Sequence, residues 1–322
     1  MRALVTGAAG FLGRALVRDL LARGDEVVAL VRSPSPALGR AGMRLRIGDV
    51  TRADDLRAAV EGCDLAFHLA GVRRATDPAE FLRVNAESTR LLCEACLSGA
   101  PRLSRLVLAG SLAASGPSAT PRRESDSFSP VEAYGASKAE AERIALSYAG
   151  RLPVTVGRPP RILGPGDREN LFFFRIARAG LAVGFTGGIR PLSWIDVDDC
   201  SRGFIALADR PEAVGEAFFL ASPEVTDAVA IQLEVARSLG VKARRVTVPG
   251  WLVRGVAEAG EALRAVTGRR LPLNRKLARQ VLAPGWVANP AKARERLGFV
   301  AGTSLADSVR RSVEWYRSEG LL

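Results

Sequence analysis

A glycine-rich turn directly after the first predicted strand constrains the fold more than any other feature of this 322-residue chain. Arg2 to Thr6 is a short apolar, β-prone run, and Arg14 to Arg23 has helical periodicity. Between them the turn carries Gly7, Gly10 and Gly13. Such glycines let a pyrophosphate approach the backbone amides at a helix N-terminus, where the dipole favours anions. The spacing is GxxGxxG rather than GxGxxG, and such turns also serve close packing, so the turn alone leaves both interpretations open.

Strands and helices alternate over the first third of the chain. Further strands are predicted at 25–31, 44–47, 65–69 and 103–108, with helices at 52–61 and 78–98 between them. This alternation predicts an α/β fold, a doubly wound parallel sheet that binds ligands at the carboxyl ends of its strands. The residues expected at this edge, directly after the strands, are Gly7, Arg32, Asp49, Ala70, Gly71 and Ser111.

Tyr134 and Lys138 stand four residues apart on a predicted helix, so their side chains share a face. A phenol with a pKa of about 10 is a poor base at neutral pH, but a neighbouring cation favours the phenolate. The alternative is a solvated pair on a helix surface. Because the pair follows a glycine turn and a predicted sheet edge, we interpret it as a proton-transfer site.

Motifs of one enzyme family occur in order along nearly the whole chain. They are Thr6 to Gly13, Gly48 to Val50, His68 to Gly71, Val84 to Ala86, Ser111 five residues before Gly116, Tyr134 to Lys138, Arg158 to Gly166, Trp194 to Asp199, and Leu297 to Phe299. This set resembles the extended short-chain dehydrogenases/reductases of the NAD-dependent epimerase/dehydratase superfamily. The greatest similarity is to the 3β-hydroxysteroid-dehydrogenase-like and dihydroflavonol-reductase-like branches.

The resemblance implies roles for individual residues. Tyr134 would be the catalytic acid/base, Lys138 would lower its pKa and bind the nicotinamide ribose, and Ser111 would donate a hydrogen bond to the substrate oxygen. The alternatives are a strand-end turn serine for Ser111 and an ordinary helix residue for Asn85. The residues that would contact the cofactor are Gly7, Gly10, Phe11, Leu12, Gly13, Asp49, Val50, Leu69, Ala70, Gly71, Asn85, Tyr134, Lys138 and Pro160.

Cofactor choice depends on the end of the second strand. NAD-preferring members of such folds have an acidic residue there, whereas an arginine can bind a 2′-phosphate. The chain has Val31, Arg32 and Ser33 at this place. Arg32 therefore favours NADP(H), with NAD(H) and a plain surface arginine as the alternatives.

Departures from the family motifs narrow the reaction. Nucleotide-sugar enzymes usually have an asparagine where this chain has Arg161, and a histidine where it has Asp196. Dehydratases have an acidic pair where this chain has Leu112 and Ala113. We therefore predict an NAD(P)(H)-dependent oxidoreductase that interconverts a ketone or aldehyde and its alcohol on a fairly apolar, steroid-, flavonoid- or polyketide-like molecule. The alternatives are a nucleotide-sugar epimerase that uses transient hydride transfer, and a non-catalytic NADP-sensing regulator.

The resemblance also implies how the chain divides. It predicts a Rossmann domain over 1–163 with a return segment at about 190–212, and a smaller mixed α/β substrate lobe over 164–189 and 213–322. The Ser- and Pro-rich segment 115–131 is expected to be a mobile loop beside the site. Apolar residues at 171–174 and 251–267 favour core packing over a substrate pocket or a peripheral membrane contact.

Composition limits the partners. The net charge of +12 invites nucleic-acid binding, but the arginines are spread along the chain without a recognised binding module. Cys93 and Cys96 lie inside a predicted helix, and His68 is the only histidine, so we expect no metal site and a packing role for His68. No run approaches the ~18 apolar residues that span a bilayer. We expect a cytoplasmic enzyme with a small-molecule substrate, no integral membrane association, and the homodimer that the family suggests.

Overall fold

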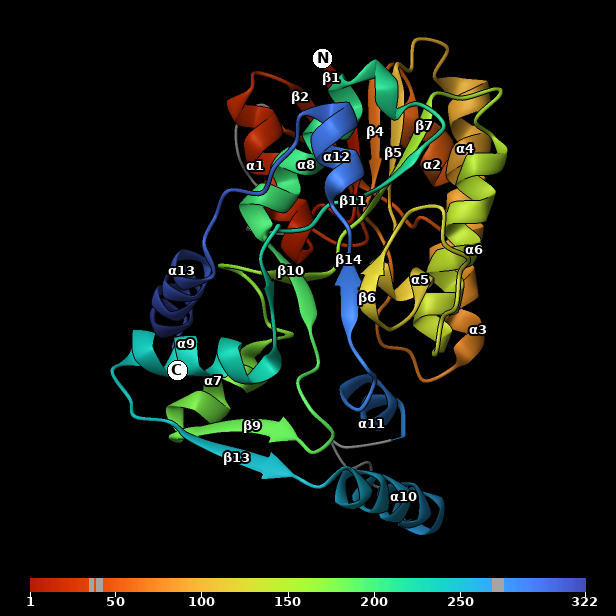
Figure 1. Cartoon of the computed structure of the whole chain (residues 1–322). Coiled ribbons are helices and arrows are strands. Elements are labelled where there is room, and N and C mark those ends of the chain that lie inside the picture. The colour runs from red at the N-terminus through yellow and green to blue at the C-terminus, as the bar shows by residue number, and fades with distance from the viewer. Residues whose placement is uncertain (35–37, 39–42, 268–274) are drawn as a thin grey trace.

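The computed structural model of the chain describes residues 1–34, 38, 43–267 and 275–322. Seven parallel strands form the central sheet in the order β11-β7-β5-β4-β1-β2-β3 (Figure 1). The order changes direction beside β1, so the carboxyl ends of β1 and β4 flank the point where ligands bind in such sheets. The strands are β1 (Arg2–Thr6), β2 (Glu26–Val31), β3 (Met43–Ile47), β4 (Leu65–His68), β5 (Arg105–Ala109), β7 (Val154–Arg158) and β11 (Ala217–Phe219).

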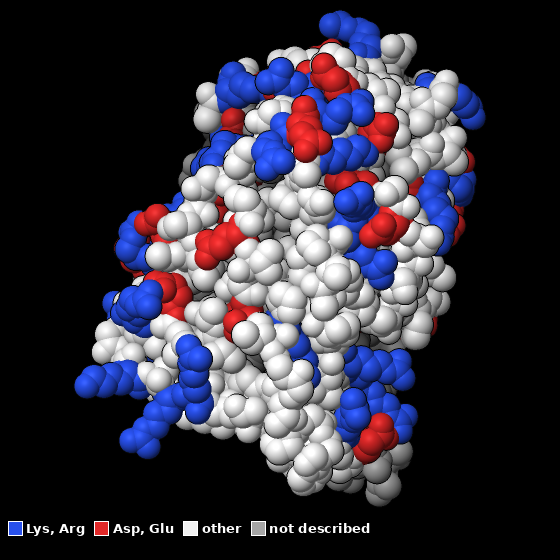
Figure 2. All heavy atoms as spheres, viewed as in Figure 1, with Lys and Arg blue, Asp and Glu red and all other residues white. Residues whose placement is uncertain are grey.

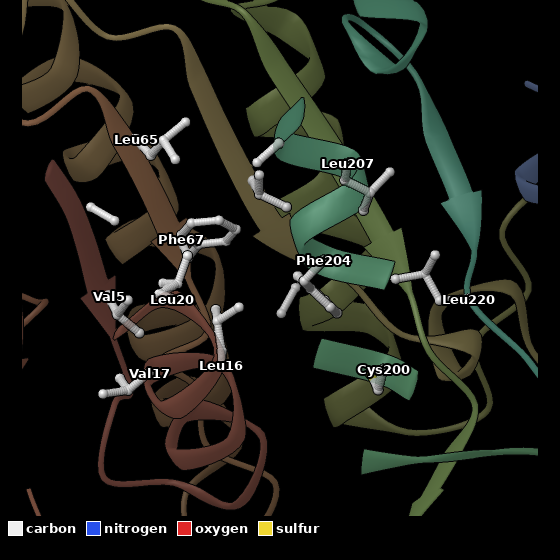
Figure 3. Packing of buried hydrophobic residues seen from close by; sticks show 14 of the residues in the cluster. Val5, Leu16, Val17, Leu20, Leu65, Phe67, Cys200, Phe204, Leu207 and Leu220 are labelled. Carbon is white, nitrogen blue, oxygen red and sulfur yellow. The ribbon is translucent and has the colours of Figure 1, made fainter. Parts of the chain in front are cut away.

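Helices cover both faces of this sheet because successive strand residues point to opposite sides. Val5 of β1 and Phe67 of β4 pack toward α1 and α8, together with Leu16 and Phe204 (Figure 3). Leu4 lies one residue earlier and packs with the helices of the other face. The helices on the first face are α1 (Phe11–Ala22), α8 (Val197–Asp209) and α12 (Ala291–Leu297); those on the second are α2 (Ala53–Val60), α4 (Ser88–Gly99) and α6 (Ala133–Ser147). The predicted doubly wound sheet is confirmed.

A second, smaller layer adjoins the carboxyl edge of the central sheet (Figure 1). Its mixed sheet has the order β12-β10-β14-β6 with β8 beside β10, and β9 pairs with β13 separately. The strands are β6 (Ser118–Arg122), β8 (Arg161–Leu163), β9 (Leu181–Phe185), β10 (Leu192–Asp196), β12 (Val225–Thr226), β13 (Arg244–Val248) and β14 (Trp286–Ala288). The helices are α7 (Leu171–Arg178), α9 (Ala228–Leu239), α10 (Gly250–Thr267), α11 (Arg275–Val281) and α13 (Leu305–Ser318). The shorter helical segments of the chain are α3 (Pro78–Phe81), η2 (Leu82–Glu87), α5 (Leu112–Ser115) and η3 (Pro211–Ala213).

The chain crosses between the two layers more often than the sequence predicts. We assigned 213–322 to the substrate lobe, but β11 pairs with β7 and completes the central sheet. Ala293 and Leu297 of α12 belong to the core of the same sheet. Conversely, β8 lies within the predicted Rossmann segment but pairs with β10 in the second sheet. These pairings depend on long-range contacts that local periodicity does not encode.

The segment 115–131 is not simply a mobile loop. It contains β6, which pairs in parallel with β14 from the far end of the chain. The sequence does not predict this strand, because Ser118–Arg122 includes a proline and shows no apolar alternation.

The predicted helix 78–98 is also divided. Its middle is a π-helix, Leu82–Glu87, between α3 and α4, and this wider turn carries the buried Asn85.

The two apolar segments of the second half differ in burial. Phe173 and Phe174 are buried in the lobe core with Tyr316, which confirms core packing for α7. In α10, Val253 and Ala257 are buried, whereas Trp251 is 73% exposed. Core packing therefore accounts for only one side of α10. Among the described residues, none of the helices combines the length and apolar composition needed to cross a bilayer.

Figure 2 shows basic and acidic residues interspersed over the upper part of this face, a largely uncharged centre, and several separate basic groups lower down. The excess positive charge is therefore not gathered in one patch on this face.

The glycine turn packs too closely to accept side chains. A Cβ on Gly13 would lie 2.1 Å from the carbonyl oxygen of Gly7, whereas a Cβ on Gly150 would meet nothing within 4 Å. We expect Gly13→Ala to lower the free energy of unfolding by about 1–3 kcal/mol, because α1 must move away from β1. Gly150→Ala should stay within about 0.5 kcal/mol of wild type. Urea unfolding of both variants measures the difference, and equal stability would contradict this packing.

Candidate active site

The turn between β1 and α1 offers backbone amides to an anion. Gly7 has φ +71°, and a Cβ there would lie 2.7 Å from the nitrogen of Ala70, so only glycine lets β1 and β4 end this close together. Gly10 is the N-cap of α1 and has no side chain to accept the amide hydrogens of the first turn. Arg14 fixes the turn by donating to the carbonyl oxygens of Ala9 (2.9 Å) and Gly166 (3.2 Å). These amides could bind a pyrophosphate.

The buried side chain of His68 holds the ends of β1 and β4 together. The Nδ1 of His68 lies 2.8 Å from Thr6 Oγ1, and its Nε2 lies 3.0 Å from Ser88 Oγ. Burial, with a smaller contribution from the charge of Lys138, lowers the pKa of His68 to about 3, so the imidazole is neutral. Thr6 Oγ1 also accepts the amide hydrogen of Ala70 (3.2 Å). His68 thus has the packing role that we expected.

Ser111, Tyr134 and Lys138 come together at the carboxyl end of β5. Ser111 follows this strand as the N-cap of α5, where its Oγ accepts from the amide of Ala113 (3.1 Å), and its side chain influences the pKa of Tyr134. Lys138 lies one turn after Tyr134 in α6 and donates from Nζ to the carbonyl oxygen of Ala109 (2.8 Å). Ser111 and Tyr134 are half-buried and Lys138 is buried. The arrangement presents two hydroxyl groups and an ammonium group to one place.

Burial controls the electrostatics of this group. It raises the pKa of Tyr134, and the charge of Arg73 and the polar side chain of Ser111 oppose the rise. The family resemblance implied that Lys138 would lower the pKa of Tyr134, but in this structure Arg73 has that role. Burial, with a further contribution from Arg73, lowers the pKa of Lys138 itself to about 8. Arg73 is thus a site residue that the sequence did not single out, because its place in a loop follows no periodic pattern.

The side chain of Asn85 links two segments of the site by hydrogen bonds. Its Oδ1 accepts from the amide of Val72 (2.8 Å), and its Nδ2 donates to Val72 O (3.0 Å) and Ser137 Oγ (2.9 Å). Both amide hydrogens are therefore in use. Asn85 joins the segment after β4 to the helix that carries Tyr134, and it can act on a cofactor chiefly by holding these segments in place.

The residues predicted near the adenosine end lie along the same edge. Arg32 is exposed after β2, and Asp49 follows β3, which pairs with β2. Asp49 accepts from the amide and hydroxyl of Thr51 (both 2.8 Å), and these bonds, together with Arg32, lower the pKa of Asp49. Val50 is partly buried against the hydrophobic core between the central sheet and the helices α2, α4 and α6.

The segment after β7 lies next to Ser111. The amide of Leu112 donates to Pro159 O (3.0 Å), which sets Pro160 beside Ser111. Arg158 forms a buried ion pair with Glu142 of α6, with Nε at 2.9 Å from Oε2. The pair fixes the helix of Tyr134 and Lys138 against β7.

Two other residues singled out from the sequence have structural roles. Asp196 is the N-cap of α8 and pairs with Arg311 (2.6 Å), which accounts for an aspartate at this position. Burial raises the pKa of the Cys93 thiol to about 12, the opposite of what a metal-ligating or redox-active thiolate needs.

The similarity of this chain to known proteins agrees with this geometry. The sequence model described as "NAD dependent epimerase/dehydratase family" matches residues 3–221. The chain belongs to this family.

Its curated relatives include a 4-hydroxy-2-methyl-3-oxo-4-farnesyl-3,4-dihydroquinoline-1-oxide ketoreductase of Stigmatella aurantiaca, 32% identical over 93% of this chain and 92% of the relative. A ceramide reductase of Caulobacter vibrioides is 28% identical over 99% and 95%. A 3-beta-hydroxysteroid dehydrogenase of Mycolicibacterium neoaurum is 29% identical over 92% and 86%. The chain is an NAD-dependent enzyme of the extended short-chain dehydrogenase/reductase type, and the predicted family is confirmed.

Solved structures share the whole fold. The structure of gox2253 has a TM-score of 0.83 and 25% identity, with 99% of each chain covered. MoeE5 in complex with UDP-glucuronic acid and NAD has a TM-score of 0.78 and 25% identity, with 99% of this chain and 100% of MoeE5 covered.

The buried ammonium of Lys138 makes a testable contribution to stability. Its pKa of about 8 in the folded protein lies below the unfolded value of 10.5, so the unfolded state binds more protons between these pH values. The free energy of unfolding should therefore gain about 2 kcal/mol from this group between pH 7 and 9.5. Lys138→Met lacks this gain, so its stability relative to wild type should fall by that amount over the same range. Urea unfolding at both pH values measures it, and a constant difference would contradict a buried, charged Lys138.

Proposed function

We propose that this chain reduces a ketone or aldehyde, or oxidises the corresponding alcohol, on a fairly apolar small molecule. The main support for the proposal is that Ser111 at the end of β5, Tyr134 of α6 and the buried ammonium of Lys138 lie together at one edge of the sheet. This group lies at the carboxyl edge of the sheet, near the switch point between β1 and β4 where folds of this kind bind dinucleotides.

The residues divide the work of the reaction. When bound, NAD(P)H supplies the hydride to the carbonyl carbon. Tyr134 Oη gives its proton to the carbonyl oxygen, which becomes a hydroxyl, and Ser111 Oγ donates a hydrogen bond as negative charge develops there. Lys138 Nζ would bind the nicotinamide ribose, and Arg73 favours the phenolate form of Tyr134. Oxidation of an alcohol uses the same groups in reverse.

The cofactor segments follow from the same placement. Gly7, Gly10, Phe11, Leu12 and Gly13 would hold the pyrophosphate at the start of α1. The contacts to the rest of the dinucleotide would come from Arg32, Asp49, Val50, Leu69, Ala70, Gly71 and Pro160, with Asn85 acting through Val72.

Two observations support an apolar substrate. The named relatives act on a farnesylated quinoline, a ceramide and a steroid, all of which carry large hydrocarbon parts. In addition, Arg161 stands where sugar-nucleotide enzymes of this family usually have asparagine.

A nucleotide-sugar epimerase is the second candidate. The similarity to MoeE5, which is described in complex with UDP-glucuronic acid and NAD, favours it. Turnover of nucleotide sugars without net change in the nicotinamide would identify an epimerase. A cofactor-sensing regulator would not need Ser111, Tyr134 and Lys138 together, so their presence disfavours that alternative.

Tyr134 is the direct test of the chemistry. Tyr134→Phe should lower the rate of NAD(P)H-dependent reduction at least about 100-fold, because the proton donor is lost, while cofactor binding stays within about twofold. The matched control is Tyr148→Phe. Tyr148 lies at the other end of α6, where its hydroxyl donates to the carboxylate of Glu94 at the surface (3.5 Å). The assay is a ketone and aldehyde panel followed by cofactor absorbance. Full activity in Tyr134→Phe would remove the proposed acid/base.

We propose NADP(H) as the preferred cofactor because Arg32 can pair with a 2′-phosphate. Arg32→Gln should weaken NADPH binding about tenfold and leave NADH binding unchanged, since NADH lacks that phosphate. Arg102→Gln is the control, because Arg102 lies just before β5, at the opposite edge of the sheet. Fluorescence titration measures both affinities. An equal effect on the two cofactors would show that Arg32 does not read the phosphate.

A further inference from the structure

Two arginines beside the catalytic group have no carboxylate partner. Arg73 and Arg161 form no ion pair with any residue in the described part of the chain. Arg73 follows β4 and Arg161 begins β8, so the two come from segments far apart in the sequence. Guanidinium groups near an enzyme site that are not neutralised by the protein are suited to bind an anion.

Arg73 lies directly over the proposed proton donor. Its Cζ is 5.9 Å from the centroid of the Tyr134 ring, and its side chain is exposed. It stands two residues after Gly71, where a Cβ would lie 3.4 Å from Lys138 Nζ. Its positive charge also acts to lower the pKa of Tyr134, Lys138 and Arg161.

Arg161 begins β8, close in the chain to a segment that is bonded to the site. It follows Pro159 by two residues, and Pro159 O accepts the amide hydrogen of Leu112 next to Ser111. Its guanidinium lies 5.1 Å from the centroid of the Phe173 ring and contacts the Asn170 side chain. Its Nε is buried and has no hydrogen-bond partner among the described residues. Burial of such a donor costs free energy unless a ligand accepts its hydrogen bond.

The nearby carboxylates are already engaged. Asp167 accepts from the amide of Glu169 (2.7 Å) and from the Asn170 side chain. Glu169 pairs with Arg74 (2.6 Å), and Glu132 accepts from Gln280. These carboxylates therefore leave Arg73 and Arg161 without a direct partner, although Asp167 and Glu169 act on Arg161 from a distance.

We propose that Arg73 and Arg161 bind a carboxylate of the substrate, so that the natural substrate is an oxo acid with an apolar chain. This inference rests on the proposed carbonyl reduction and names its substrate class. The carboxylate would sit between the two guanidinium groups, with the carbonyl toward Tyr134 and Ser111. Two guanidinium groups that no carboxylate neutralises attract an anion, and the apolar chain of the substrate is free to contact the lobe.

The test measures binding without turnover. The complex with NADPH is titrated with 3-hydroxydecanoate and with its uncharged methyl ester, and cofactor fluorescence reports binding. Neither compound can react with the reduced cofactor, so the result does not depend on catalysis. We expect the acid to bind about 10- to 100-fold more tightly than the ester, as charge-assisted hydrogen bonds would give.

Variants assign the preference to these residues. Arg161→Gln and the exposed Arg73→Gln should each lower acid binding about tenfold and leave ester and NADPH binding unchanged. Arg168→Gln is the matched control, because Arg168 is 70% exposed and faces Glu319 instead. It should keep the full preference for the acid.

Four results would overturn the inference. Wild type could bind acid and ester equally, or could bind neither. The preference for the acid could survive in both variants. The variants could also lose NADPH affinity to the same degree as acid affinity, which would mean that the arginines serve the cofactor. A preference for the acid without any reduction of oxo acids would instead count against the proposed function and leave the anion site standing.

Discussion

The bond from Lys138 Nζ to the carbonyl oxygen of Ala109 is the contact on which the site depends. It joins the helix of Tyr134 to the end of β5 and brings a charge into the core, with Lys138 only 5% exposed. Burial disfavours the charged amine, which is why its pKa lies well below that of a free lysine. A methionine could fill the same space without this cost. The retention of a charged group in such a place is typical of function rather than stability.

Other buried contacts maintain this geometry. The ion pair between Arg158 and Glu142 fixes the same helix against β7, and Asn85 fixes it against the segment after β4. Removal of one partner of a buried ion pair costs about 3–5 kcal/mol, so this connection is hard to change. His68 and the close approach at Gly7 set the distance between β1 and β4. The hydroxyl groups of Ser111 and Tyr134 are therefore held by rigid elements rather than by loops.

Local patterns in the sequence predict much of this structure. The strands of the central sheet and the shared face of Tyr134 and Lys138 follow from periodicities of about 2 and 3.6 residues, which the chain itself determines. The pairing of β6 with β14 and of β11 with β7 joins distant segments, and no local pattern indicates it. The same reason hides Arg73, whose importance comes from the ring that it lies over and not from its neighbours in the sequence. In the sequence Arg161 is only a departure from a motif, because its contacts with Phe173 and Asn170 form between segments that the fold brings together.

The central claim is that the nicotinamide end of the cofactor meets Lys138 and Tyr134 at the switch point between β1 and β4. A crystal structure of the protein with bound NADP⁺ tests it most directly. The account predicts a ribose hydroxyl within about 3 Å of Lys138 Nζ and the nicotinamide ring beside Tyr134 and Ser111. A nicotinamide ring bound elsewhere, with Lys138 still bonded to Ala109 O alone, would contradict it.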